Sequence, residues 1–97
     1  MTNDNRALPL HGVTVLDLGQ IYQGPYAGFL LAMAGARVIK IEQTRGEPLR
    51  ARGDSLPYAA LNSCKEAVTL DLKSIEGHEM FLGLATSADV VLVNYAP

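Results

Sequence analysis

The chain has 97 residues, of which 48% are hydrophobic and 19% charged, a composition typical of a small globular domain. Its formal net charge of −2 gives no reason to expect nucleic acid or an anionic membrane as a partner. A single cysteine, Cys64, excludes an intrachain disulfide and agrees with a cytoplasmic location. The longest nearly uncharged run, residues 26–36, is too short to span a bilayer, so no membrane contact is expected.

Two apolar-rich runs near the N-terminus predict strands. Val13–Leu18 shows no helical spacing, as in a strand that is buried on both faces. Arg37–Glu42 is a second run of this kind and places Glu42 at its exit, where a lone acid is most simply solvated. Asp17, inside the first run, is expected to hydrogen-bond to nearby backbone rather than to act in catalysis.

A helix is predicted between these two strands. Pro25 suits a first helical position, and Gly35 is a typical residue beyond a helix end. The apolar face expected to contact the sheet consists of Ala27, Leu30, Leu31 and Ala34. Strand, helix and strand together predict a right-handed parallel βαβ unit.

The second half of the chain predicts another such unit after a long loop. Gln43–Lys65 has no clean period, apart from a short helical turn at Tyr58–Leu61. A strand is expected at Ala67–Leu72 and another at Ala88–Val93. Between them, a helix capped by Ser74 runs to about Thr86. Its sheet-facing residues are expected to be Phe81, Leu84 and Ala85.

These elements predict an α/β fold with a Rossmann-like parallel sheet. A parallel sheet needs helices on both faces, and only two helices are clear in this sequence. We therefore expect residues 1–97 to form the N-terminal portion of a larger domain, with no internal boundary.

Polar residues follow each predicted strand, and in a parallel sheet these positions meet at one rim. The residues concerned are Gln20, Tyr22 and Gln23 after the first strand, Glu42 at the exit of the second, Asp71 and Lys73 after the third, and Asn94 and Tyr95 after the fourth. Arg45, Arg50 and Arg52 in the long loop suit a polyanionic ligand. No metal site is expected, because His11 and His78 form no metal-ligand spacing with Cys64 or an acid. The sequence therefore predicts a small-molecule site at this rim.

The chain resembles the N-terminal part of the class III coenzyme A transferases, the family of formyl-CoA transferase and of the carnitine and bile-acid-inducible CoA transferases. The resemblance extends from about Leu8 to Pro97. It is carried by VLDLGQIYQGPYAGFLLAMAGARVIKIE, GEPLR, YAALNSCKEAVTLDLKSIEGHEMF and ADVVLVNYAP, in this order. The resemblance implies an enzyme that transfers CoA from an acyl-CoA donor to a carboxylic acid, with no metal cofactor and as an interlocked homodimer.

The resemblance also implies which residues bind coenzyme A or acyl-CoA. Tyr22 and Gln23 would border the thioester and pantetheine, and Gln43 the nucleotide end. Leu70, Asp71, Leu72 and Lys73 would form the adenosine pocket, and Asn94, Tyr95 and Ala96 match the triplet after the fourth strand. The catalytic aspartate of the family lies beyond residue 97. The chain departs from many relatives in having Gln43 in place of an arginine or proline, and Glu66 in place of an arginine.

Three alternatives remain open at this point. An α-methylacyl-CoA racemase shares the N-terminal pattern, but its link between the second and third strands tends to be shorter than Gln43–Lys65. A nicotinamide- or nucleotide-binding half-domain is disfavoured by the absence of a G-x-G-x-x-G motif. A non-catalytic truncated fragment with a binding or scaffold role is the third.

Overall fold

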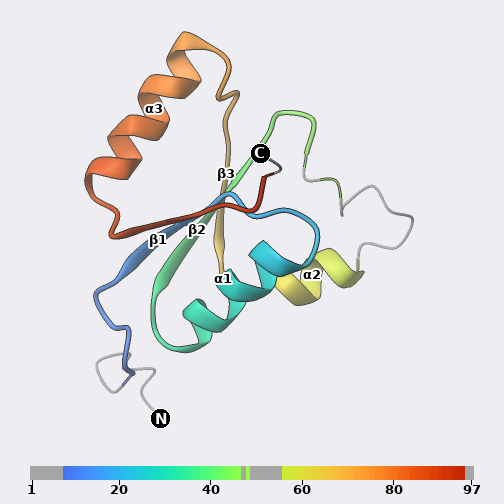
Figure 1. Ribbon diagram of the computed structural model, residues 1–97, viewed down its shortest axis with the longest axis vertical. Helices are drawn as coiled ribbons and strands as arrows, with labels where there is room; N and C mark the ends of the chain where they lie inside the picture. The colour runs from blue at the N-terminus through green and yellow to red at the C-terminus, as the bar shows by residue number, and fades with distance from the viewer. Residues whose placement is uncertain (1–7, 47, 49–55, 96–97) are drawn as a thin grey trace.

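The computed structural model describes residues 8–46, 48 and 56–95. Over this part of the chain, strands and helices alternate from β1 to β4 (Figure 1). They are β1 (Thr14–Asp17), α1 (Gln23–Met33), β2 (Arg37–Glu42), α2 (Leu56–Asn62), β3 (Glu66–Thr69), α3 (Ile75–Thr86) and β4 (Val90–Leu92). Every strand pair is parallel, and the order across the sheet is β3-β2-β1-β4. The predicted α/β class and parallel βαβ units are confirmed.

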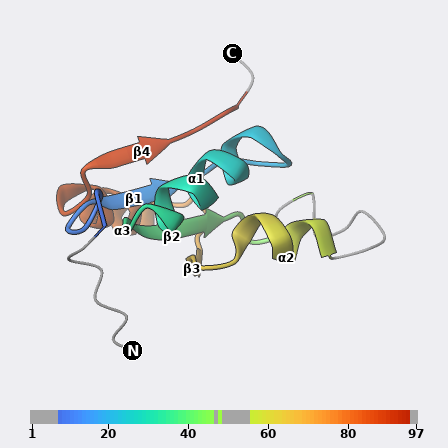
Figure 2. The same ribbon diagram turned by 90° about the horizontal axis from the view of Figure 1, so that it is seen from below.

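The helices cover both faces of the sheet. Figures 1 and 2 show α1 and α2 on one face and α3 on the other. The strand order reverses direction at β1, because the chain moves outward from β1 to β3 and then returns to place β4 on the other side of β1. Such a reversal creates a crevice at the carboxyl ends of the strands, where α/β proteins bind their ligands.

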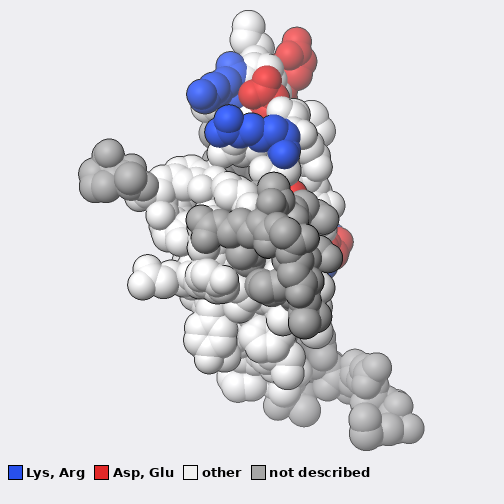
Figure 3. Space-filling view, turned by 90° about the vertical axis from the view of Figure 1, so that its right-hand side faces the viewer, with Lys and Arg blue, Asp and Glu red and all other residues white. Residues whose placement is uncertain are grey.

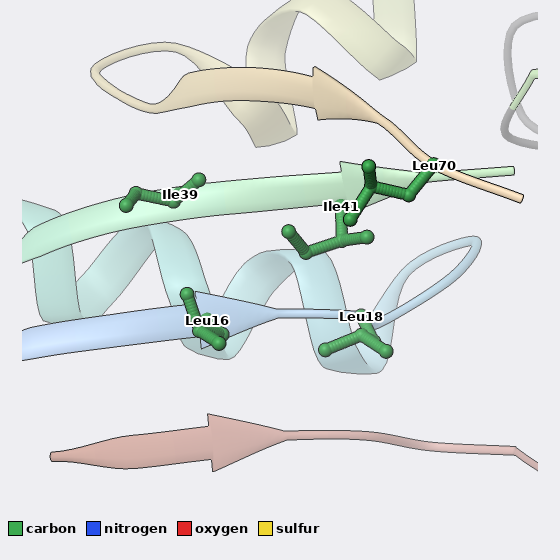
Figure 4. Close-up of a cluster of buried hydrophobic side chains, with 5 residues drawn as sticks. All are labelled: Leu16, Leu18, Ile39, Ile41 and Leu70. Carbon is green, nitrogen blue, oxygen red and sulfur yellow. The ribbon is translucent and has the colours of Figure 1, made fainter. Parts of the chain in front are cut away.

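The core lies in two layers, one on each face of the sheet. On the α3 face, the buried cluster consists of Leu16, Leu18, Ile39, Ile41 and Leu70 (Figure 4). Phe81, Leu84 and Ala85 of α3 pack against it, as predicted for this helix. On the α1 face, Val15, Ala36 and Val38 pack against Leu31 and Ala32. Neighbouring residues along β1 and β2 thus point to opposite layers, which explains why both strands are apolar on both faces.

The predicted sheet-facing side of α1 is wrong in part. Leu30 is 49% exposed, and the buried residues of this helix are Gly24, Pro25 and Gly28. A Cβ atom on Gly28 would lie 2.5 Å from Oδ2 of Asp17 in β1. Because apolar residues surround this helix, their spacing did not define one face. Glycines defined it instead, by allowing the helix backbone to approach the strand.

The ends of the elements differ from the prediction by a few residues. Pro25 is the third helical residue of α1 rather than the first, still within the turn whose N–H groups lack helical partners. Gly35 has φ of 107° directly beyond the end of α1, as expected for a terminator. The predicted turn in the long loop is the seven-residue helix α2. Within the described residues, no helix is long and apolar enough to cross a bilayer.

The third strand ends earlier than predicted because a tight turn begins at Asp71. The Asp71 Oδ1 atom accepts the Lys73 N–H at 3.1 Å, and its carbonyl accepts the Ser74 hydroxyl at 2.9 Å. The Ser74 hydroxyl oxygen in turn accepts the Gly77 N–H at 2.9 Å and caps α3, as predicted. β3 therefore ends at Thr69, and the chain turns directly into α3.

The two mid-helix glycines Gly28 and Gly83 should respond oppositely to alanine. Gly28→Ala forces a methyl group onto Asp17, so we expect a loss of about 1–3 kcal/mol in unfolding free energy. A methyl group on Gly83 of α3 would have no atom within 4 Å, so Gly83→Ala should gain about 0.5–1 kcal/mol from helix propensity. Urea midpoints measure both changes. Equal effects of the two substitutions would contradict the close approach at Gly28.

Candidate functional site

A hollow of about 420 Å³ lies at the carboxyl edge of the sheet. It is formed by loops that follow all four strands, which the parallel topology brings to this edge. The lining residues are Gln20 after β1, Gln43, Thr44 and Arg45 after β2, Leu70, Asp71, Leu72 and Lys73 after β3, and Tyr95 after β4. The hollow coincides with the reversal of strand order at β1, the expected ligand position in such a sheet.

The structure brings together most, but not all, of the residues predicted for the rim. Gln43, Leu70–Lys73 and Tyr95 line one hollow with Gln20. Tyr22 and Gln23 do not line it and lie exposed at the start of α1. Ala96, Arg50 and Arg52 lie outside the described residues. Thr44 was missed by the sequence analysis, although its place next to Gln43 gives it the same access.

The hollow combines charged and apolar walls. Arg45 and Lys73 supply cations and Asp71 an acid, while Leu70 and Leu72 supply apolar surface. The Arg45 Nε atom donates to Oε1 of Gln43 at 3.2 Å, so Gln43 orients the cation that follows it. In the space-filling view of Figure 3, Lys, Arg, Asp and Glu side chains among the described residues gather at one end of the face shown. This combination suits an anionic ligand with an apolar or aromatic part.

Tyr95 contributes a neutral hydroxyl group to the hollow. Partial burial raises the pKa of its phenol above the usual 10.0, so the hydroxyl is protonated at neutral pH. It can therefore donate a hydrogen bond to a ligand oxygen. Tyr95 is 47% exposed, which leaves its ring accessible from solvent.

The loop between β1 and α1 is closed tightly on itself. A Cβ atom on Gly19 would lie 2.6 Å from Cα of Gly24, so the two ends of the loop touch through their glycines. Asn94 holds this loop from the neighbouring strand: its Nδ2 donates to the Gln20 carbonyl at 3.0 Å, and its Oδ1 accepts the Gln20 N–H at 2.8 Å. The wall of the hollow at Gln20 is thus attached to the exit of β4.

A buried ion pair supports the same loop from inside the protein. The Lys65 ammonium lies 2.7 Å from Oδ2 of Asp17, and their side chains are 1% and 0% exposed. Lys65 also donates to the carbonyl of Pro25 at 2.8 Å and to Oδ1 of Asn62 at 2.7 Å. The second carboxylate oxygen of Asp17 accepts the Gly19 N–H at 2.8 Å, as expected from sequence. Two charges thus fix both ends of the loop, at Gly19 and Pro25.

Two further charged residues of β2 are buried beside this pair. Lys40 is 1% exposed, and its ammonium donates to the Gly19 carbonyl at 2.9 Å. Glu42 is 6% exposed and accepts a hydrogen bond from the Tyr58 hydroxyl, so the prediction of a solvated strand end is wrong. α2 covers this end of β2 and carries Tyr58, whose ring centroid lies 6.0 Å from the Lys40 ammonium. Among the described residues, no buried side-chain nitrogen or oxygen lacks a hydrogen-bond partner.

A second hollow, of about 430 Å³, lies at the opposite, amino edge of the sheet near Arg37 and Glu66. Arg37 donates to both carboxylate oxygens of Glu66, at 2.6 and 3.1 Å, and lowers the pKa of that carboxyl. Glu66 therefore lines the amino-edge hollow and not the carboxyl-edge one. Ligands of parallel sheets bind at the carboxyl edge, which favours the first hollow despite the similar volumes. Within the described residues, no three His, Cys, Asp or Glu side chains are grouped to hold a metal.

The chain is similar in sequence to a family of known proteins. Residues 10–97 match CoA-transferase family III. The chain is 38% identical to the succinyl-CoA–L-malate CoA-transferase alpha subunit of Chloroflexus aurantiacus, over 93% of this chain and 23% of that protein. It is 40% identical to the formyl-CoA:oxalate CoA-transferase of Afipia carboxidovorans, over 94% of this chain and 23% of that protein. The chain therefore spans about a quarter of the length of these relatives.

Solved structures show the same fold. A crystal structure of a mutant of Rv3272 from Mycobacterium tuberculosis superposes with a TM-score of 0.84 at 41% identity, covering 93% of this chain and 26% of that chain. A CAIB/BAIF family protein from Brucella suis superposes with a TM-score of 0.86 at 34% identity, covering 91% of this chain and 26% of that chain. The strands and helices described above thus correspond to one part of each of these longer proteins.

Removing the buried cation should destabilise the fold far more than removing an exposed one. Lys65→Met leaves the Asp17 carboxylate buried without its ammonium partner, so we expect a loss of about 3–5 kcal/mol. Adding Asp17→Asn should recover part of this loss, because the neutral amide oxygen still accepts the Gly19 N–H. Urea unfolding measures each change in free energy, provided that the dependence of that free energy on urea concentration is the same in all variants.

Arg37→Ala is the matched control for this prediction, because it breaks an ion pair whose side chains are 62% and 59% exposed. Exposed pairs contribute little, so its midpoint should stay close to that of the wild type. A Lys65→Met variant that unfolds at the same urea concentration as Arg37→Ala would show that the buried pair is not required.

Proposed function

Since the chain belongs to CoA-transferase family III, we propose that it forms the coenzyme A-binding part of an enzyme that moves CoA from an acyl-CoA donor to a carboxylic acid. The observation that supports this most directly is the hollow at the carboxyl edge, where cations and apolar walls meet. Coenzyme A combines phosphates, an adenine base and a long pantetheine arm. A binding site for it therefore needs both kinds of wall.

We assign the nucleotide end of coenzyme A to the wall after β3. Leu70 and Leu72 offer apolar surface to the adenine base, and Lys73 offers an ammonium group to the phosphates. The Asp71 carboxylate accepts the Lys73 N–H and so shapes the turn that presents these side chains. On the facing wall, Gln43 orients Arg45, which supplies the cation that residue 43 itself lacks.

The pantetheine arm would then run toward the loop after β1. Tyr95 lines the hollow on this side, and Asn94 and Ala96 flank it in sequence. Tyr22 and Gln23, at the start of α1, are assigned to the thioester end. In this arrangement the acyl group lies beside the tightly held loop from Gly19 to Gly24, and the nucleotide lies toward α3.

The described aspartates are not placed to act as the nucleophile. Asp17 is 0% exposed and engaged by Lys65, and Asp71 holds the turn before α3. Asp89 accepts the Thr14 N–H at 2.9 Å, at the start of the edge strand and away from the hollow. A carboxylate must be exposed at the thioester to attack it. We therefore place the reacting carboxylate in another part of the enzyme.

We also propose that residues 1–97 are one part of a larger domain that works as a homodimer without nucleic acid or membrane partners, in the cytoplasm. Exposed apolar side chains on the edge strand and on the outer side of α1 support further contacts. They are Val90 and Val91 of β4, Val93 directly after it, and Tyr26, Leu30 and Met33 of α1, each 41–56% exposed. Further protein, from the same or another copy, would remove them from water.

Coenzyme A binding should depend on the cation at the carboxyl edge and not on the one at the amino edge. In the complete gene product, Lys73→Ala should weaken coenzyme A binding by about five- to tenfold, because a charge-assisted contact to phosphate is lost. Arg37→Ala at the opposite edge should change the dissociation constant less than about twofold. Isothermal titration calorimetry measures both, and equal losses would place the nucleotide elsewhere.

Residues 1–97 expressed alone should show no transferase activity, because the described aspartates are buried or engaged in turns and strand contacts. The measurement mixes this chain with succinyl-CoA or formyl-CoA and a carboxylic acid, and follows the new thioester by chromatography. Turnover above the uncatalysed rate that disappears on mutating Asp17, Asp71 or Asp89 would show that the nucleophile lies in this segment.

A further inference from the structure

Both polar atoms of the Asn94 side chain are directed at one residue of another loop. Its Nδ2 donates to the Gln20 carbonyl at 3.0 Å, and its Oδ1 accepts the Gln20 N–H at 2.8 Å. The two residues are 74 positions apart and follow the neighbouring strands β4 and β1. Gln20 lines the carboxyl-edge hollow, whereas Asn94 does not. This contact therefore connects a residue of the hollow's wall to a residue outside the hollow.

The residue after Gln20 has an unusual backbone conformation. Ile21 has φ of 65°, in the left-handed region that β-branched side chains rarely adopt. Such a conformation persists only where its surroundings hold it. The Asn94 contact holds the Gln20 backbone on one side, and the contact between Gly19 and Gly24 closes the loop on the other.

We propose that Asn94 is a positioning residue for the coenzyme A site: its amide holds Gln20 and the left-handed turn at Ile21, and this gives the hollow its wall. This inference rests on the proposed function, since coenzyme A is the ligand whose binding reports the wall. It replaces the ligand contact that the family resemblance implies for the Asn94 side chain.

An amide is required at this position, because one donor and one acceptor must face the N–H and the carbonyl of a single residue. A carboxylate of the same shape accepts from the N–H but places a negative oxygen against the carbonyl. Asn94→Asp therefore removes the hydrogen bond that the side chain donates to the Gln20 carbonyl, with almost no change of volume. Residue 94 is exposed, so the Asn94→Asp variant is expected to fold.

Asp89 provides a matched control at the other end of the same strand. Its Oδ2 atom accepts the Thr14 N–H at 2.9 Å, so this side chain also joins β4 to the backbone of the β1 strand. It lies at the amino edge, away from the hollow. Asp89→Ala therefore tests whether any weakening of the contact between β4 and β1 is sufficient to disturb ligand binding.

The experiment measures coenzyme A dissociation constants by calorimetry for the complete gene product, with thermal unfolding of each variant. Asn94→Asp should weaken binding about tenfold, the effect of about one lost hydrogen bond. Asp89→Ala should change the dissociation constant less than about twofold, even if its melting temperature falls as much as that of Asn94→Asp. Ile21→Gly should make the site tolerant of Asn94→Asp, with a loss below about threefold, because glycine adopts the left-handed turn without help.

The outcomes separate this inference from the proposed function. A wild-type protein that does not bind coenzyme A overturns both. Binding by the wild type, with Asn94→Asp equally harmful in the isoleucine and glycine backgrounds, overturns only the role of the turn. Equal losses for Asp89→Ala and Asn94→Asp would show that Asn94 merely fastens the edge strand. An unchanged affinity in Asn94→Asp would likewise overturn the positioning role.

Discussion

The structure depends most on the burial of the Asp17 carboxylate at the end of the central strand. A charge in this position requires an opposite charge and further hydrogen bonds, because the desolvation of an unpaired carboxylate is very unfavourable. Lys65 supplies the charge and the Gly19 N–H a hydrogen bond. The ammonium of Lys65 also binds the carbonyl of Pro25, so satisfying one carboxylate fixes the start of β3, the start of α1 and the loop between β1 and α1. The same requirement excludes any side chain at position 28, because a methyl group there would occupy the space of this pair.

The rim of the site depends on this interior arrangement more than on its own contacts. Asn94 holds Gln20 through hydrogen bonds. Lys65 holds Gly19 indirectly, through the Asp17 carboxylate that accepts the Gly19 N–H, and Lys40 holds it directly, by donating to the Gly19 carbonyl. On the other side of the hollow, the turn from Asp71 to Ser74 is held by hydrogen bonds within itself. The walls of the hollow are thus set by buried charges and by turns, which leaves the exposed side chains of Lys73, Arg45 and Tyr95 available for a ligand.

Much of the fold and part of the rim could be predicted from sequence, for reasons that particular residues make clear. Ser74 is a helix cap through a local hydrogen bond, and Phe81 and Leu84 recur at helical spacing on the side of α3 that packs against the sheet. The rim followed from topology, since parallel strands end at one edge. These features depend on local chemistry or on the periodicity of one element.

The remaining features depend on partners far apart in the sequence. Lys65 and Asp17 are 48 residues apart, and no periodicity reveals that they meet. Glu42 was expected in water, because its cover is a helix, α2, that sequence indicated only as a turn. One signal was available: charged residues inside runs that are otherwise buried on both faces, such as Asp17 and Lys40, require partners of opposite charge or polar backbone. Leu30 faces solvent because glycine, a residue without an apolar side chain, determined the contact face of α1.

Because the Lys65–Asp17 ion pair is buried, salt should affect the stability of the fold and ligand binding at the hollow differently. Mobile ions screen charges in water over about 8 Å at physiological ionic strength, but they do not enter a region where both side chains are at most 1% exposed. The cations of the hollow face solvent, where counterions compete with any anionic ligand. Added salt therefore acts on the occupancy of the rim while the scaffold beneath it keeps its shape, and ionic strength becomes a means of emptying the site without loosening the protein.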